Sequence, residues 1–429
     1  MSRHTSAARN SLPGADDIYR QTLKNGIVVL ARPNFNSPSV VVNGYLPAGS
    51  LFDPDEKLGL ADFTSAALMR GTHKRNFQQL YDALESVGAS FGYEAGIHNA
   101  GFSGRSLAED LPLLLEIMTE TLLQPAFPVD QVERLRAQLL TGLAIRAQDT
   151  SEMASIQFDE ILFEGHPYSR VEEGWPETIQ AITRDDLVEF HRRYYGPKGM
   201  VIAIVGAVQP EEAVGQVESF LGGWQNRVQP DAPTLPEPRR LAETVRRQHV
   251  IPGKSQSDLV IGTNGPKRRD SEYMAASLGN NILGQFGLMG RIGDVVREQA
   301  GLAYYAYSRL NAGIGPGSWY VSAGLNPSNV ERAAELIVQE LKRFVDEGIT
   351  AEELADSQAN YIGLLPLSLE SNAGVAGALL NIERYDLGLD YYRQYPDLVR
   401  AVTVEEVREA ARKFITPTRL AIATAGPAN

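Results

Sequence analysis

The stretch Gly59-Leu-Ala-Asp-Phe-Thr-Ser-Ala-Ala-Leu-Met-Arg-Gly-Thr72 decides how the rest of the chain is interpreted. Leu60, Phe63 and Ala67 recur at the spacing of one helical face, and Gly71 follows as a stop signal. The pattern therefore predicts a short buried helix that ends before Gly71.

This helix resembles the metal-binding helix of the insulinase and pitrilysin-like zinc peptidases, a family that includes the mitochondrial processing peptidases. In that family the helix reads G-x-A-H-F-x-E-H and continues through an apolar run to G-T. By this resemblance Asp62 stands at the first histidine, Ser65 at the catalytic glutamate and Ala66 at the second histidine. The third zinc ligand, a glutamate on a later helix, falls near Gly142, and no glutamate occurs between residues 134 and 151.

The residues at these four positions cannot bind zinc or activate water as their counterparts in the family do. Two imidazoles on adjacent turns can hold zinc, and a glutamate between them can take a proton from bound water. Ala66 offers no donor atom and Ser65 is no base. The resemblance thus implies a chain without zinc, and the alternative left open is an ordinary core helix whose likeness to the motif is chance.

The composition is that of an ordinary globular protein of more than one domain. The 429 residues exceed what one hydrophobic core supports, and 43% are hydrophobic and 22% charged. The net charge of -13 argues against nucleic-acid binding, and the absence of cysteine excludes disulfides and thiolate sites. The N-terminus lacks the apolar core of a signal peptide, and no apolar run is long enough to cross a bilayer, so the expected location is the cytoplasm without membrane contact.

Hydrophobic periodicity predicts alternating strands and helices through the first half. Strands are expected within 21–31, 39–46 and the glycine-rich run 88–104, and helices over 77–87 and 107–123. Asp130 is expected to cap a further helix that continues through residue 143. The motifs Gly165-His-Pro-Tyr168, Phe190-x-x-x-Tyr-Tyr-x-Pro197 and the apolar run from Met200 to Gly206 also resemble the peptidase family, in the same order.

The chain repeats itself after a proline-rich stretch at residues 229–238. Gly44 and Gly262 each end an apolar run and differ by 218 residues, whereas the runs ending at Gly206 and Gly426 differ by 220. Asp130 and Thr350, each placed to cap a helix, also differ by 220. An offset this long indicates a duplicated domain rather than a short structural repeat.

The predicted fold class is α+β, with two duplicated domains that each pack helices on a mostly antiparallel mixed sheet. The expected boundaries are 1–228 for the N-terminal domain with the degenerate zinc site, 229–240 for the linker and 241–429 for the C-terminal domain. The family resemblance implies that such a chain is half of a clamshell dimer enclosing a peptide-sized chamber.

The segment from Gly290 to Tyr304 contains the most informative polar residues of the second half. It resembles the family's R-L-x-x-x-x-R-x-x-x-G-L-A-Y segment, whose arginine and tyrosine reach the substrate at the zinc. The residues at those positions are Arg297 and Tyr304. A guanidinium and a phenol can donate hydrogen bonds to a substrate carbonyl or to a tetrahedral oxyanion. The alternatives are a surface ion pair for Arg297 and a core position for Tyr304.

Other polar residues carry weaker expectations. The six histidines include no pair at helical spacing, and His166 and His191 fall in motifs where a hydrogen-bonded scaffold role is expected. Asp53, with Asp55 and Glu56, is expected in a solvated acidic loop.

Three hypotheses for function follow. The preferred one is a zinc-free subunit of a heterodimeric zinc metallopeptidase, inactive alone, that supplies Arg297 and Tyr304 to a peptide held by a partner bearing H-x-x-E-H and zinc. The second is a scaffold subunit without catalytic contribution. The third is an independent hydrolase with a metal at Asp62 and His98, for which two scattered ligands are weak support. A homodimer of the isolated chain is also left open.

Overall fold

The computed structural model describes residues 12–428, and contacts within the chain divide it into two compact units. The first unit comprises the chain up to Leu143 together with Arg170–Thr234 and Pro366–Arg393, and the second comprises Ala144–Ser169, Leu235–Leu365 and the chain from Gln394 onward. Each unit thus takes most of one sequence half and a segment of the other. These units are defined by contacts within the chain, so the expected boundaries at residues 228 and 241, which concern the duplicated halves of the sequence, remain a prediction. Residues 1–11, on which the expectation about a signal peptide rests, lie outside the described residues.

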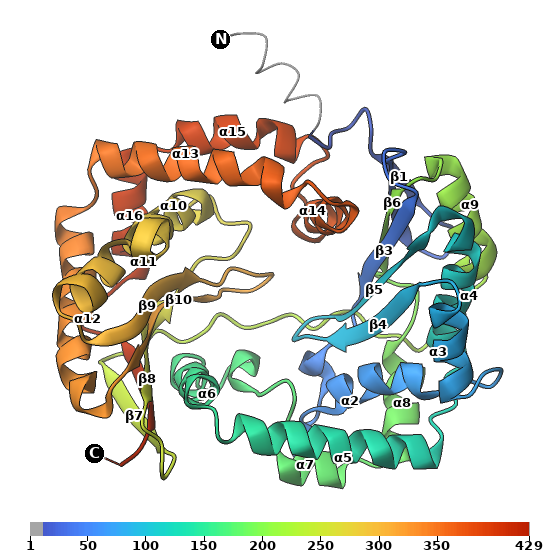
Figure 1. Ribbon diagram of the computed structural model, residues 1–429, viewed down its shortest axis with the longest axis horizontal. Helices are drawn as coiled ribbons and strands as arrows, with labels where there is room; N and C mark the ends of the chain where they lie inside the picture. Colours follow the sequence, from blue (N-terminus) through green and yellow to red (C-terminus); the bar gives the residue numbers. More distant parts are fainter. Residues whose placement is uncertain (1–11, 429) are drawn as a thin grey trace. The chain divides into compact units, whose positions relative to one another are not determined.

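The first unit contains a six-stranded sheet in the order β1-β2-β6-β3-β5-β4 (Figure 1). Its strands are β1 (Tyr19–Thr22), β2 (Val28–Pro33), β3 (Ser39–Leu46), β4 (Ser90–Ala95), β5 (Ala100–Leu107) and β6 (Val201–Gly206). β2 pairs with β6 in parallel, and the other neighbours are antiparallel. β6 reads Val-Ile-Ala-Ile-Val-Gly and every residue is buried, as expected for a strand covered on both faces.

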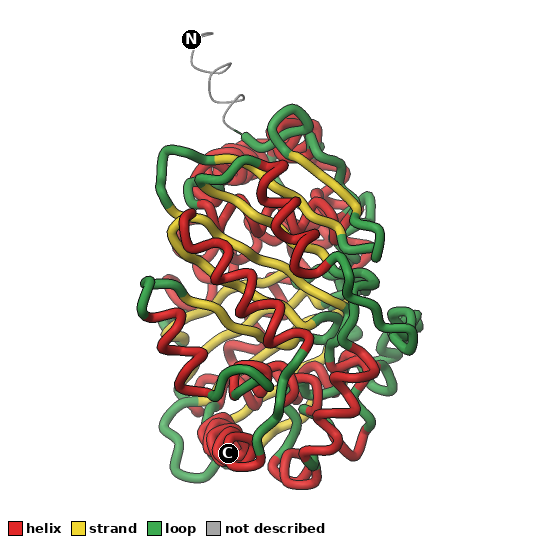
Figure 2. Tube along the Cα trace, turned by 90° about the vertical axis from the view of Figure 1, so that its right-hand side faces the viewer, coloured by secondary structure: helices red, strands yellow, loops and turns green. Residues whose placement is uncertain are grey.

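Helices cover both faces of this sheet, because alternate residues of each strand point to opposite sides. One face carries the larger core, formed with helices such as α4 and α9 that lie across the strands (Figure 2). The helices of this unit are α2 (Leu60–Ala67), α3 (Phe77–Glu85), α4 (Leu111–Leu123), most of α5 (Val129–Arg146), α7 (Pro176–Ala181), α8 (Arg184–Tyr194), α9 (Pro210–Leu221) and α14 (Asn372–Tyr385). On the other face, α14 packs on β3 and β6, and its residues Leu379 and Ile382 belong to a second core together with Leu30 and Val41.

The second unit contains a five-stranded sheet in the order β7-β11-β8-β10-β9. Its strands are β7 (Val245–Val250), β8 (Ser257–Asn264), β9 (Ala303–Leu310), β10 (Ser318–Leu325) and β11 (Ala421–Gly426). Its helices are α6 (Thr150–Leu162), α10 (Tyr273–Gly284), α11 (Phe286–Gly293), the π-helix η6 (Asp294–Gln299), α12 (Val330–Glu347), most of α13 (Ala351–Ser368), most of α15 (Tyr391–Ala401) and α16 (Val404–Phe414). α10, α12 and α16 form the core on one face. On the other face, α6 packs on β8 and β11, and Phe158 meets Tyr320 with ring centroids 5.5 Å apart.

The strand orders confirm the duplication that the sequence offsets predict. After β1, the order β2-β6-β3-β5-β4 matches β7-β11-β8-β10-β9, and the parallel pair β2 with β6 has its counterpart in β7 with β11. The α+β fold class with two helix-packed mixed sheets is therefore confirmed. The equivalent helices α6 and α14 each follow a long helix, α5 or α13, within which the chain passes from one unit to the other. Each of the two helices thus covers the sheet formed mainly by the other half of the sequence.

Most predicted elements occur close to their expected bounds. The helix over 60–67 is extended by the 3-10 turn Leu68–Arg70 and ends at Gly71, whose φ of 138° few other residues adopt. Asp130 is an exception, because α5 begins one residue earlier at Val129 and Asp130 lies inside its first turn. Thr350 does cap α13, and its hydroxyl accepts a hydrogen bond from the Glu353 N–H at 3.1 Å. Within the described residues, no single helix combines the length and hydropathy of a membrane span, although the bent pair α13 and α14 does so by length and composition alone.

Candidate functional site

α2 carries the positions that correspond to the zinc-binding motif, and a buried carboxylate holds its N-terminus. The two carboxylate oxygens of Asp53 accept hydrogen bonds from the backbone N–H groups of Gly59 at 3.0 Å and Ala61 at 2.9 Å. This satisfies donors that the first turn of a helix leaves unpaired. The expectation that Asp53 is merely solvated is therefore wrong, since its exposure is 3%, whereas Asp55 is exposed as expected.

The three α2 positions offer one carboxyl, one buried hydroxyl and one methyl group. Ser65 is fully buried, and within residues 12–428 neither its hydroxyl nor that of the buried Tyr195 makes a hydrogen bond of normal geometry, although the two hydroxyls interact with each other. Asp62 is half-buried, and burial, followed by the nearby Glu173 charge, raises its pKa to about 6. Burial and the charges of Glu173 and Asp62 likewise raise the pKa of Glu172 to about 7. Asp62 thus lies near further carboxyls, whose negative charges disfavour its ionisation.

Gly142 lies on α5, an exposed position where an added Cβ would meet nothing within 4 Å. α5 is held close to α2, because the Arg136 guanidinium lies 5.2 Å from the centre of the Phe63 ring and Arg70 donates a hydrogen bond to Gln138. The backbone has room for a longer side chain at residue 142. The third ligand is therefore absent because of the residue type rather than because of a steric block.

These residues do not fit a zinc ion. Ala66 and Gly142 have no donor atom, and Ser65 is a buried neutral hydroxyl. Residues 12–428 contain no group of three or more histidine, aspartate or glutamate side chains arranged to hold a metal ion. In this part of the chain, the suggested centre at Asp62 and His98 has no third metal-binding side chain, and burial together with the Arg384 charge lowers the pKa of His98 to about 4.

The two arginines of the second motif have different environments. Arg291 is 15% exposed and forms a two-pronged ion pair with Glu353, at 2.7 Å for each nitrogen–oxygen contact. It also donates a hydrogen bond to the Gly348 carbonyl at 3.1 Å and lies 3.7 Å from the buried Glu340 carboxylate. Arg297, on η6, is 37% exposed, and its nearest ionic partner is the adjacent Glu298 at 3.7 Å. Arg291 therefore anchors this helical segment, whereas the Arg297 guanidinium remains available.

Tyr304 lies where the pairing of an edge strand is interrupted. β9 forms the edge of the second sheet, and Tyr305 is opposite Gly324 while Ala303 is opposite Leu325. Tyr304 is the unpaired extra residue of this bulge, a device that re-aims a side chain. The Tyr304 side chain is 62% exposed, whereas that of Tyr305 donates a hydrogen bond to Asp258. The expected core alternative for Tyr304 is thus excluded.

Sequence models of known protein families match both halves of the chain. The Insulinase (Peptidase family M16) model matches residues 28–170, and the Peptidase M16 inactive domain model matches residues 181–361. The chain belongs to the insulinase-type M16 peptidase family. A solved M16 inactive domain from Pseudomonas fluorescens has a TM-score of 0.90 and 27% identity, covering 96% of this chain and 98% of that one.

M16 relatives extend over nearly the whole chain. An uncharacterized zinc protease of Mycobacterium leprae is 28% identical over 420 residues, covering 96% of this chain and 92% of the relative. A probable mitochondrial-processing peptidase subunit beta of Arabidopsis thaliana is 26% identical over 214 residues, covering 50% of this chain and 40% of that protein. The structure of a protease from Helicobacter pylori shares the fold, with a TM-score of 0.89. It is 20% identical in sequence, and the match covers 97% of this chain and 100% of that one.

The sequence predicts the motif positions, but not the residues that hold or surround their side chains. The motif includes Arg291 but does not indicate its anchoring role, and no local pattern singles out Glu172, because its neighbour Asp62 is distant in sequence. The scaffold role expected for two histidines is confirmed. His166 donates from Nε2 to the Pro236 carbonyl and accepts at Nδ1 from the Tyr168 N–H, both at 3.1 Å. His191 donates from Nε2 to the Leu122 carbonyl at 2.8 Å.

Proposed function

We propose that this chain is a zinc-free subunit of a heterodimeric M16 peptidase and supplies Arg297 and Tyr304 to a peptide held at the partner's zinc. The observation that carries the proposal is a contrast between the two motifs. The α2 motif has lost its ligands and base, whereas the second motif retains both donor side chains, exposed and without strong partners of their own among the described residues.

The chemistry of the two donors suits amide hydrolysis. Attack on a peptide carbonyl places negative charge on the oxygen, and preorganised donors stabilise that charge. The Arg297 guanidinium contributes a positive charge and the Tyr304 phenol a single O–H donor. Arg291 fixes the start of the segment that carries Arg297, and the bulge at Tyr304 turns the phenol away from the sheet core. These contacts support a positioning role for the surrounding structure.

The test is reconstitution with a catalytic subunit that bears H-x-x-E-H. Native purification first identifies that partner, and peptide turnover is then measured with Arg297→Ala or Tyr304→Phe in this chain. We expect each variant to assemble and to lose on the order of 10² to 10³ in rate, the typical effect of removing one oxyanion donor. Arg332→Ala is the matched control, since Arg332 is 60% exposed and forms a surface ion pair with Glu335.

Two outcomes would contradict the proposal. Variants that assemble and turn over peptide at the wild-type rate would favour a scaffold subunit. Variants that fail to assemble, while Arg332→Ala assembles, would assign Arg297 and Tyr304 to the interface. Size-exclusion chromatography of each mixture separates these cases.

A further inference from the structure

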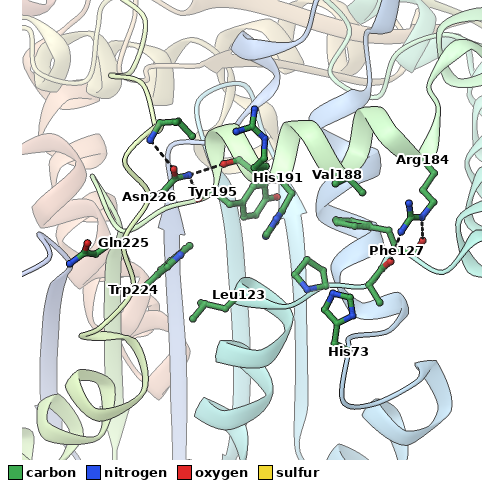
Figure 3. A pocket seen from close by; sticks show the side chains of 14 residues that line it. His73, Leu123, Phe127, Arg184, Val188, His191, Tyr195, Trp224, Gln225 and Asn226 are labelled. Carbon is green, nitrogen blue, oxygen red and sulfur yellow. Dashed lines mark hydrogen bonds between the residues drawn. The ribbon is translucent and has the colours of Figure 1, made fainter.

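The first unit contains a cavity of about 450 Å³ that none of the motifs uses. It lies between α8, the segment that follows α4 and the segment that follows α9 (Figure 3). Its volume falls in the range of small-molecule sites. Trp224 and Leu123 border one side and His73 and Arg184 lie toward the other, as Figure 3 shows.

Side-chain contacts to the main chain fix both walls of this cavity. Arg184 donates hydrogen bonds to the carbonyls of Phe127 at 2.7 Å and Ala126 at 3.1 Å. Phe127 is buried and has a φ of 46°, a left-handed conformation that a bulky residue adopts only where its surroundings impose it. On the other wall, Asn226 donates to the carbonyls of Tyr195 at 2.8 Å and Arg192 at 2.9 Å. The cavity is therefore preformed rather than a gap between mobile segments.

The charge of the lining is opposite to that of the whole protein. Arg184, Arg192 and His73 line the cavity, and none of the described aspartates or glutamates does, although the chain has a net charge of -13. Arg192 pairs with Glu189 on the same helix, at the surface, where such a pair contributes little. The His73 ring makes no hydrogen bond within residues 12–428. Arg184 also lies 3.6 Å from a carboxylate, that of the exposed Asp185, and such surface pairs are weak, so the two arginines still favour an anion.

The remaining lining suits a flat apolar group. The indole of Trp224 and the side chains of Leu123 and Val188 present carbon surface to the cavity. His191 also lines it but adds no charge, because burial lowers its pKa and its Nε2–H is used by the Leu122 carbonyl. Aromatic rings stack on indole, and arginine binds carboxylates with its planar fork of donors.

We propose that this cavity binds a small organic anion with a flat apolar body, of the class of aromatic carboxylates. Stacking against Trp224 holds the ring, and the arginines of the lining, Arg184 and Arg192, attract the anionic group, while the His73 ring offers a hydrogen bond. This site belongs to the first unit alone and does not depend on the proposed peptidase role.

The experiment titrates the purified full chain with naphthalene-2-carboxylate and with its neutral analogue naphthalene-2-methanol, by ligand-observed NMR and calorimetry. A ligand of this size should bind with a Kd on the order of 1 mM or tighter. We expect the alcohol to bind at least about tenfold more weakly, since it lacks the charge that arginine recognises. Equal binding of the two probes would overturn the assignment to an anion. An absence of binding at a probe concentration of about 10 mM, roughly ten times that Kd, would overturn the site itself.

Matched variants locate the binding. Val228 lines the cavity and is 54% exposed, so Val228→Trp should fill it without disturbing the core and should lower affinity at least about tenfold. Arg192→Gln should lower affinity for the carboxylate but not for the alcohol. Arg193→Gln is the control, because Arg193 is the next residue on α8, is exposed and does not line the cavity. An equal loss in Arg192→Gln and Arg193→Gln, or unchanged affinity in Val228→Trp, would refute the proposal.

Discussion

Replacing Asp62 by asparagine should stabilise the first unit at neutral pH. Asp62 stands at the position of a zinc ligand in the motif that α2 resembles, and burial together with Glu173 raises its pKa to about 6 from a usual value near 3.8. A folded-state pKa above the unfolded one means that the folded chain holds the proton more tightly. The stabilisation is therefore present at low pH and is lost as pH rises from about 4 through about 6.

The gain in stability expected for Asp62→Asn follows from the pKa shift of Asp62. One pKa unit corresponds to about 1.4 kcal/mol, so ionised Asp62 costs the folded state about 3 kcal/mol at pH 8. The same relation gives about 1.5 kcal/mol at pH 5 and about 0.5 kcal/mol at pH 4. These values are upper limits, because the side chain is only half-buried. An asparagine side chain cannot ionise and keeps the size of the aspartate, so Asp62→Asn should remove the cost.

The assay is thermal unfolding of wild type and Asp62→Asn at pH 5 and pH 8, followed by the fluorescence of Trp175 and Trp224 in the first unit. A gain of about 3 kcal/mol corresponds to a rise of about 6–12 °C in Tm at pH 8, with a smaller rise at pH 5. Glu218→Gln is the control, since this exposed carboxylate on α9 should change stability by less than about 0.5 kcal/mol at either pH. A loss of stability at pH 8, or a change that is the same at both pH values, would refute the reasoning.

Three further predictions concern the core, the anchor and the metal. Leu379→Ala should destabilise the first unit by about 2–5 kcal/mol, because α14 covers one face of its sheet, and urea unfolding followed at Trp224 measures this. Arg291→Gln should cost about 1.5–3 kcal/mol by breaking the ion pair with Glu353, while Arg343 still pairs with the buried Glu340; an unchanged unfolding midpoint of the second unit would contradict the anchoring role. The purified chain should bind no stoichiometric zinc and cleave no unfolded peptide, as elemental analysis and a peptidase assay can check; zinc-dependent cleavage by pure chain would contradict this.

Local signals in the amino-acid sequence determined the elements and the repeat. Apolar spacing located α2, and Gly71 marked its end, because helix periodicity and stop signals depend on residues within a few positions of one another. The offsets of 218 and 220 residues located equivalent strands, and the matching strand orders confirm them. The loss of ligands at Ala66 and Gly142 needs no structure, since neither residue has a donor atom.

Only the tertiary structure decided which surfaces these elements cover. No local pattern in α14 indicates that it packs on the sheet of the first unit, whose strands are far away in sequence. The sequence around Asp53 is that of a loop, and only the structure shows that its carboxylate binds the first N–H groups of α2. Arg291 and Arg297 are both arginines of the same motif, but the first is held in an ion pair and the second is partly exposed. The exposure of Tyr304 follows from a bulge opposite Gly324. Burial and pairing depend on residues brought together by long-range packing, which local patterns do not encode.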